Sequence, residues 1–210
     1  MIKLEKTDVM NFENAIRGMR NPMNSWDKND SCFNWNTCSY YIGPNDLALA
    51  RRLIKAGSDH RKFLRQIFVS VDITAPLYWY KEFDTYKIST VSNSCSTMHK
   101  IHAKPFCLSD FSIDQLNCDI PDCFYDTLIY LNESREKFLE TKDKKYWWRM
   151  IQTLPSSYNQ LRTVTLNYET LLNQYHARKH HKLDEWHDYC EWIETLPYFK
   201  EMCLEDGMDG

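Results

Sequence analysis

The sequence predicts an α+β fold, a single domain spanning residues 1–210 in which a small central sheet is packed by long helices. Three observations lead to this prediction. Short segments alternate apolar and polar residues like strands, longer segments repeat apolar residues at helical spacing, and no repeat or linker interrupts them. With 210 residues, 43% of them hydrophobic, the chain is long enough to bury a full core.

The N-terminal quarter is expected to contain one strand and one helix. Residues 2–6 alternate apolar and polar side chains, which indicates a short strand. Residues 11–19 have helical spacing and stop before the Asn-Pro turn at residues 21–22. Residues 24–41 show neither period, and we expect them to form a loop.

A helix, a strand and a second helix are predicted next. The first helix starts at Gly43-Pro44-Asn45-Asp46 with Asn45 as its cap, and it ends at Gly57. Residues 66–74 are β-branched and alternating, which favours a strand. Pro76 can then begin a helix over residues 77–87, because the first turn of a helix does not need its missing N–H.

The following segments are a polar loop and two helices. Residues 89–96 are small and polar, which is typical of a loop whose amides and hydroxyls meet a ligand and equally of an ordinary surface loop. A long amphipathic helix is predicted over residues 121–142, with Phe124, Leu128, Leu131 and Phe138 on its apolar side. A shorter helix over residues 144–153 follows it.

The segment from Leu154 to Trp186 carries the most specific pattern. A β-branched run around residues 163–165 is followed by Asn167, which is expected to cap a helix with Leu171, Leu172 and Tyr175 on its apolar face. Arg178 falls near the end of this helix. There its guanidinium is free for a ligand, or is simply a surface cation that favours the helix dipole.

Composition excludes several classes of protein. Its 26 basic and 29 acidic residues give a net charge of -3, which argues against binding to a nucleic acid polymer. No apolar run is long enough for a membrane-spanning helix and no secretory signal opens the sequence, so we expect a cytoplasmic protein. The eight cysteines include no Cys-x-x-Cys pair, and reduced thiols are expected.

Two stretches resemble the flavin-dependent thymidylate synthases. Asn167 lies twelve positions after Pro155 and Arg178 eleven positions after Asn167, an arrangement similar to the C-terminal part of that family. Residues 57–98 resemble its central part, with Asp59-His60 before a short helix, a strand ending in Ala75-Pro76, and a helix leading to a serine-rich loop.

The resemblance implies a site and its ligands. The substrate would be a pyrimidine deoxynucleotide such as dUMP, methylated reductively with FAD, NADPH and methylenetetrahydrofolate in a homotetramer whose sites lie between subunits. By position, His60, Tyr86 and Asn167 would contact the flavin. The residues expected to bind the nucleotide are Arg178, Arg149, Lys87, Ser94, Cys95 and Ser96.

The chain departs from the family at its signature. Thr85-Tyr86-Lys87 stands where the family has Arg-His-Arg, and Cys95 stands at the signature Ser. Glu169 occupies a position where the family often has Arg, and an acid there would repel a phosphate. Catalytic residues are therefore left unassigned. A nucleotide-binding or protein-interaction protein on the same scaffold is the alternative to an enzyme.

Two further patterns carry weaker hypotheses. Cys95 invites a nucleophile interpretation, but a small residue in a tight loop is the favoured one. His176, His180, Asp184 and His187 recur at helical spacing, as metal ligands on one face would. A solvated, positively charged helix face explains them better, and we expect no metal.

Overall fold

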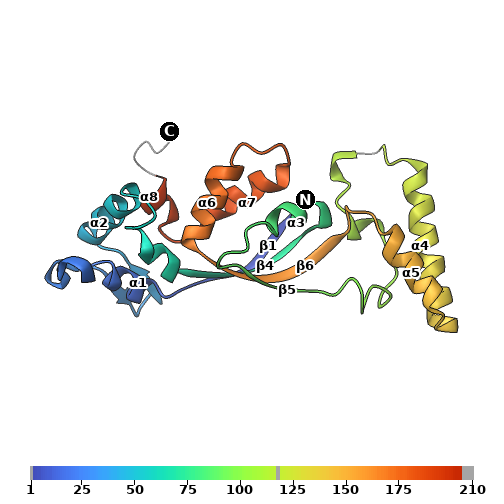
Figure 1. The fold of residues 1–210 in the computed structure, drawn as a ribbon, viewed down its shortest axis with the longest axis horizontal. Helices are drawn as coiled ribbons and strands as arrows, with labels where there is room; N and C mark the ends of the chain where they lie inside the picture. Colours follow the sequence, from blue (N-terminus) through green and yellow to red (C-terminus); the bar gives the residue numbers. More distant parts are fainter. Residues whose placement is uncertain (1, 117–118, 205–210) are drawn as a thin grey trace. The chain divides into compact units, whose positions relative to one another are not determined.

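Residues 2–116 and 119–204 are described by the computed structural model drawn in Figure 1. Their contacts divide the chain into two compact units. Unit 1 holds the residues up to 3 together with 72–85 and 92–163, and unit 2 holds 4–71, 86–91 and the residues from 164 onward. The single domain expected from the sequence stays a prediction, and each unit is described by itself.

The main sheet has four strands in the order β1 (Lys3–Met10), β4 (Phe68–Pro76), β6 (Asn159–Asn167) and β5 (Val91–Ser94). Together with the helices it confirms the predicted α+β class. Along β4, Val69, Val71 and Ile73 are fully buried and alternate with less buried residues. β1 is longer than predicted because it lies at the sheet edge, where mostly exposed polar residues hide the strand period.

Unit 2 contains most of the helices, and large aromatic side chains form much of its core. Tyr168 at the start of α6 makes edge-to-face contacts with Phe12 and Phe199. Its α-helices are α1 (Phe12–Gly18), α2 (Pro44–Lys55), α6 (Tyr168–Arg178), α7 (Asp184–Glu194) and α8 (Phe199–Cys203), and its short helices are η1 (Asn21–Met23), η2 (Trp26–Lys28) and η3 (Lys62–Gln66).

The prediction of a loop over residues 24–41 was wrong. This segment contains η2 and a hairpin of β2 (Cys32–Asn34) and β3 (Ser39–Tyr41), with Cys32 paired to Tyr41. Each strand has only three residues and little burial, so neither shows an alternating pattern.

The predicted cap of α2 also needs correction, because Gly43 and not Asn45 precedes the helix. Asp30 supplies the missing acceptors: its carboxylate oxygens accept from the backbone N–H groups of Asn45 at 2.8 Å and Asp46 at 3.0 Å. A cap from a distant residue leaves no local sequence signal.

The helix predicted over residues 77–87 is shorter in the structure, where α3 covers Leu77–Phe83. The Thr85 hydroxyl donates to the carbonyl of Glu82 at 2.7 Å and satisfies an acceptor at the helix end. The predicted loop over residues 89–96 includes β5, and the Cys95 N–H just after it donates to the Leu161 carbonyl at 2.9 Å.

Unit 1 matches the sequence analysis more closely. α4 (Asp122–Thr141) and α5 (Lys144–Thr153) lie where periodicity predicted them, and Leu131 and Met150 are their fully buried residues in a shared core with Ile101, Phe106 and Phe111. The Asp143 side chain caps α5 by accepting from Lys145 N–H at 2.9 Å. Two short helices, η4 (Leu108–Asp110) and η5 (Asp114–Leu116), complete the unit.

Two expectations concern the environment of the protein. Within residues 2–116 and 119–204, no helix combines the length and the apolar character needed to cross a membrane. The seven cysteines in these ranges are free thiols, while Cys118 lies outside the described residues.

Candidate functional site

The predicted site residues of unit 2 are arranged around α6, which follows β6 directly. Asn167 joins the two elements as a helix cap, since its Oδ1 accepts from Thr170 N–H at 2.9 Å. Its Nδ2 donates to the Arg65 carbonyl at 3.4 Å, and the residue is only 2% exposed. The predicted cap is confirmed. Both ends of the Asn167 amide are thus bonded within unit 2. Contact between Asn167 and a flavin stays a prediction.

Arg178 and Tyr86, which were predicted to bind different ligands, lie together at the end of α6. Arg178 Nε donates to the Tyr86 hydroxyl at 2.9 Å. The guanidinium carbon lies 5.5 Å from the centre of the Tyr86 ring and 5.0 Å from that of the fully buried Trp186. The expectation of a free guanidinium is therefore wrong, because Tyr86 holds its Nε.

These contacts orient the Arg178 cation. A guanidinium that lies beside aromatic rings and is bonded through Nε loses fewer conformations when it binds a second group. The last carbonyls of α6 add negative potential that favours a cation here. A guanidinium oriented in this way is a suitable cation for a phosphate.

The segment of residues 86–91 is fastened to α6 by more than Arg178. The Thr170 hydroxyl donates to the Ile88 carbonyl at 3.3 Å. Lys87, between these two attachments, is exposed. This attached segment therefore carries an exposed, flexible cation directly after Tyr86.

Glu169 is compensated by a residue that sequence reasoning missed. Arg61 Nε and Nη2 both donate to Glu169 Oε1, at 3.1 and 3.0 Å, and Nη2 also donates to Asn173 Oδ1 at 3.3 Å. Glu169 is 8% exposed, and its Oε2 is buried without a hydrogen-bond partner among the described residues. Because Arg61 neutralises it, the repulsion expected between Glu169 and a phosphate is reduced. No local pattern in the sequence points to this partner, because Arg61 lies 108 positions before Glu169.

His60, the predicted flavin contact next to Arg61, is exposed, and its backbone N–H donates to the Gly57 carbonyl at 3.0 Å. It is Arg61 that reaches α6 from this turn.

The remaining predicted residues belong to unit 1. Arg149 is exposed on α5, with its guanidinium carbon 5.1 Å from the centre of the Tyr146 ring. Ser94 ends β5, and the Cys95 carbonyl accepts from Gln160 Nε2 at 2.7 Å. The Ser96 hydroxyl accepts from two backbone N–H groups in the turn that follows. The predicted nucleotide-binding set is thus divided, with Lys87 and Arg178 in unit 2 and the others in unit 1.

The histidines and Asp184 predicted to share one helical face do not lie on one helix, because α6 ends at Arg178 and α7 begins at Asp184, with His180 between them. His187 Nδ1 lies 3.8 Å from Asp184 Oδ1, and both side chains are exposed. In the described part of the chain, no group of three or more His, Cys, Asp or Glu residues is placed to hold a metal ion.

Comparison with known proteins gives matches only among solved structures. No protein-family model and no curated protein matches the chain. Thymidylate synthase X (ThyX) from Helicobacter pylori, solved with FAD and dUMP, matches with a TM-score of 0.68 and 15% identity over 98% of each chain. The UMP/dUMP methylase PolB from Streptomyces cacaoi, bound with 5-Br dUMP, matches with a TM-score of 0.60 and 14% identity over 93% of this chain and 89% of its own. The chain therefore has the fold of the flavin-dependent thymidylate synthases.

Proposed function

We propose that the chain binds a pyrimidine deoxynucleotide such as dUMP, with its phosphate on Arg178. The observation that carries this proposal is the Arg178 guanidinium held at Nε by Tyr86, 2.9 Å away, beside the buried Trp186 ring. Two proteins of the same fold were solved with dUMP or its 5-bromo derivative, which supports a pyrimidine nucleotide as the ligand. Lys87 would add a second, flexible cation.

The described residues of unit 2 fit FAD less well than they fit a phosphate. Asn167 is buried with both amide ends bonded, and Tyr86 already accepts from Arg178. Thr85-Tyr86-Lys87 also offers one cation where the resembled signature has two arginines. We therefore assign no chemical step through a flavin.

Reductive methylation of dUMP is the second candidate function. The Helicobacter pylori protein, whose structural match covers 98% of this chain, was solved with both FAD and dUMP. This observation favours the methylation reaction. That function would require FAD, NADPH and methylenetetrahydrofolate. It would also need the homotetramer that the sequence resemblance implies, because Lys87 and Arg178 would then be completed by residues of other subunits.

Thermal denaturation with and without dUMP tests nucleotide binding. A ligand selective for the folded state stabilises it by about 2.7 kcal/mol at a hundred times its Kd, so saturating dUMP is expected to raise Tm. Deoxyuridine, which lacks the phosphate, should raise it much less. Arg178→Gln should abolish the dUMP effect, whereas Arg52→Gln, at an exposed arginine of α2, should retain it. The absence of a shift with any nucleotide would instead favour a protein-interaction module.

The visible absorption spectrum of the purified protein separates the two candidates. A colourless protein that is stabilised by dUMP and does not bind added FAD is a nucleotide-binding protein. A bound flavin would support the methylation reaction. The triple variant Thr85→Arg, Tyr86→His and Lys87→Arg then shows whether the lost signature alone prevents flavin binding.

A further inference from the structure

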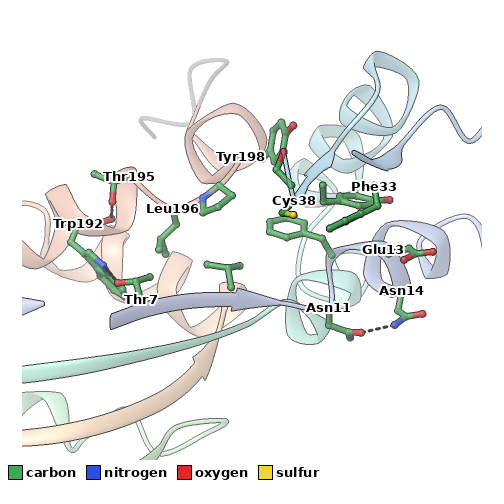
Figure 2. Close-up of a pocket in the computed structure, with 15 residues that line it drawn as sticks. Thr7, Asn11, Glu13, Asn14, Phe33, Cys38, Trp192, Thr195, Leu196 and Tyr198 are labelled. Atoms are coloured by element: carbon green, nitrogen blue, oxygen red, sulfur yellow. Dashed lines mark hydrogen bonds between the residues drawn. The ribbon is translucent and has the colours of Figure 1, made fainter. Parts of the chain in front are cut away.

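A cavity of about 870 Å³ lies in unit 2 (Figure 2). None of its lining residues is among the candidate site residues described above around α6. Its walls come from β1, α1, the β2–β3 hairpin, the end of α7 and the turn between α7 and α8. The lining residues are Thr7, Val9, Asn11, Phe12, Glu13, Asn14, Phe33, Cys38, Ser39, Tyr40, Trp192, Thr195, Leu196, Pro197 and Tyr198. This volume is within the range of small-molecule sites.

Aromatic rings form much of the wall and are held in place. Phe12 stacks on Tyr40 with ring centres 6.1 Å apart and meets Tyr198 edge-on at 6.2 Å. The Tyr198 hydroxyl accepts from Ile42 N–H at 3.3 Å. At the other end of the cavity in Figure 2, Trp192 Nε1 donates to the Thr7 hydroxyl at 3.0 Å. Rings fixed in this way suit a planar ligand that packs against them.

Glu13 supplies a carboxylate to the wall of the cavity. Arg17 donates to Asn14 at 2.8 Å, Asn14 to Asn11 at 2.7 Å, and Asn11 to the Gln66 carbonyl at 2.9 Å, so the amides beside it are bonded to one another. The Glu13 side chain is exposed and makes no hydrogen bond or ion pair with the described residues. It is also the one charged residue of the lining, which contains no Lys or Arg.

The local charge is consistent with this arrangement. Burial raises the pKa of Tyr40 to about 12, and the nearby carboxylates of Asp46 and Glu13 add to the increase. Tyr40 is therefore a neutral hydroxyl at physiological pH, and a dianionic phosphate would meet the Glu13 charge with no lining cation to offset it.

The backbone around the cavity is strained at three residues. Asn11, Cys38 and Tyr198 have positive φ values of 74°, 49° and 57°. They lie before α1, in the turn of the β2–β3 hairpin and before α8, and such conformations are retained where the surrounding structure fixes them, often at ligand sites. This supports a site whose shape is set before a ligand arrives.

We propose that this cavity binds a planar nitrogen heterocycle without a phosphate, whose edge presents two neighbouring N–H donors to the Glu13 carboxylate. A carboxylate accepts two parallel hydrogen bonds from such an edge, and the rings of the wall cover its faces. Guanine and pterin rings share this edge, whereas adenine lacks it. The proposal is independent of a nucleotide on Arg178.

Titration of protein labelled with ¹⁵N-tryptophan tests the proposal, because Trp192 lies in the cavity and Trp186 lies beside Arg178. The Trp192 indole signal, assigned with Trp192→Phe, should shift on adding guanosine or pterin, and the Trp186 signal should not. The probe that binds more tightly, guanosine or pterin, shows which of the two ring systems the cavity prefers. Adenosine, which lacks the edge with two N–H donors, should bind at least about tenfold more weakly than the better of the two probes. GMP should be weaker by at least as much, because its phosphate is repelled by the Glu13 carboxylate.

Two variants link binding to Glu13. Glu13→Gln removes the negative charge and one hydrogen-bond acceptor, and should raise the Kd of the better probe by about tenfold. Glu5→Gln, at an exposed acid of β1 outside the cavity, should bind like the wild type. Equal binding by Glu13→Gln, tighter binding of GMP than of guanosine, or no response to either probe at millimolar concentration would each overturn the proposal. If dUMP still raises the Tm of Glu13→Gln, the proposed nucleotide site at Arg178 does not depend on the cavity.

Discussion

At the scale of single residues, Asp46 is a buried acid that accepts several hydrogen bonds. It has no exposed surface and is paired with the buried Arg20. Its Oδ2 accepts from the backbone N–H groups of Asp30 and Ser31, both at 3.1 Å, and from the Ser31 hydroxyl at 2.6 Å. Together these bonds tie the start of α2 to the segment before the hairpin.

Replacing Asp46 with Asn should therefore destabilise the protein strongly. The change leaves the Arg20 charge buried without its partner, and breaking a buried pair in this way costs about 3–5 kcal/mol. Urea unfolding followed by tryptophan fluorescence measures the loss. Asp27→Asn, at an exposed residue of η2, is the matched control and should change the unfolding free energy by less than about 0.5 kcal/mol. A similarly small change for Asp46→Asn would contradict the role given to this pair.

Residue roles were predictable only where they depend on near neighbours. The Asn167 cap follows from the three residues after it, and it was confirmed. The Arg61–Glu169 pair joins residues 108 positions apart, and the Arg178–Tyr86 bond joins residues 92 positions apart. No periodicity or spacing encodes such contacts. Arg178 and Tyr86 were therefore predicted to bind separate ligands, and Arg61 was missed.

At the scale of elements, Glu194 joins three helices of unit 2. Near the end of α7 it accepts from the Tyr175 hydroxyl of α6 and pairs with Lys200 of α8, both at 2.7 Å. The Lys200 ammonium, followed by the Tyr175 hydroxyl, lowers the pKa of Glu194 from its ordinary value of 4.5.

This shift predicts how stability depends on pH. Because the folded pKa lies below the unfolded one, the contribution of Glu194 is present above the unfolded pKa and is lost as pH falls through the folded pKa. Unfolding free energy should therefore decrease as pH is lowered from about 5 through the ordinary range of Glu. Glu194→Gln should make this decrease smaller, and Glu191→Gln, at an exposed neighbour, should leave it unchanged. An identical pH profile for all three proteins would show that the junction contributes nothing.

Predictability of elements follows their length and burial. α4 and α5 have one apolar face and one solvated face over 20 and 10 residues, and periodicity located both. The hairpin and β5 have strands of three or four mostly exposed residues. Elements of that size bury too little to leave a pattern, and tertiary pairing decides them.

At the scale of the whole molecule, each unit has its own core while the sheet uses residues of both. β4 and β6 each contribute residues to unit 1 and to unit 2. The predicted nucleotide-binding residues are divided in the same way, with Arg149 in one unit and Arg178 in the other. The sequence could predict which residues resemble a known site but not their grouping, because grouping depends on the complete fold and on any assembly.

The exposed apolar residues of unit 1 give the proposed homotetramer a test. α4 exposes Tyr125, Ile129, Tyr130 and Leu139, and α5 exposes Trp148. Apolar residues gathered on one helical hairpin are typical of a surface covered by another protein chain, and we expect a second copy of this chain there. Ile129 is 57% exposed, so a charge at this position should disturb an interface without unfolding the subunit.

Size-exclusion chromatography with light scattering should give the wild type a mass of four chains and Ile129→Glu a smaller one. Met23→Glu, at a residue of η1 that is 82% exposed, introduces the same charge in unit 2 rather than on α4 of unit 1 and should keep the larger mass. If dUMP stabilises the wild type but not the dissociated Ile129→Glu, the nucleotide site depends on more than one subunit. A monomeric wild type that still binds dUMP would place the entire site within one chain, and would count against sites between subunits.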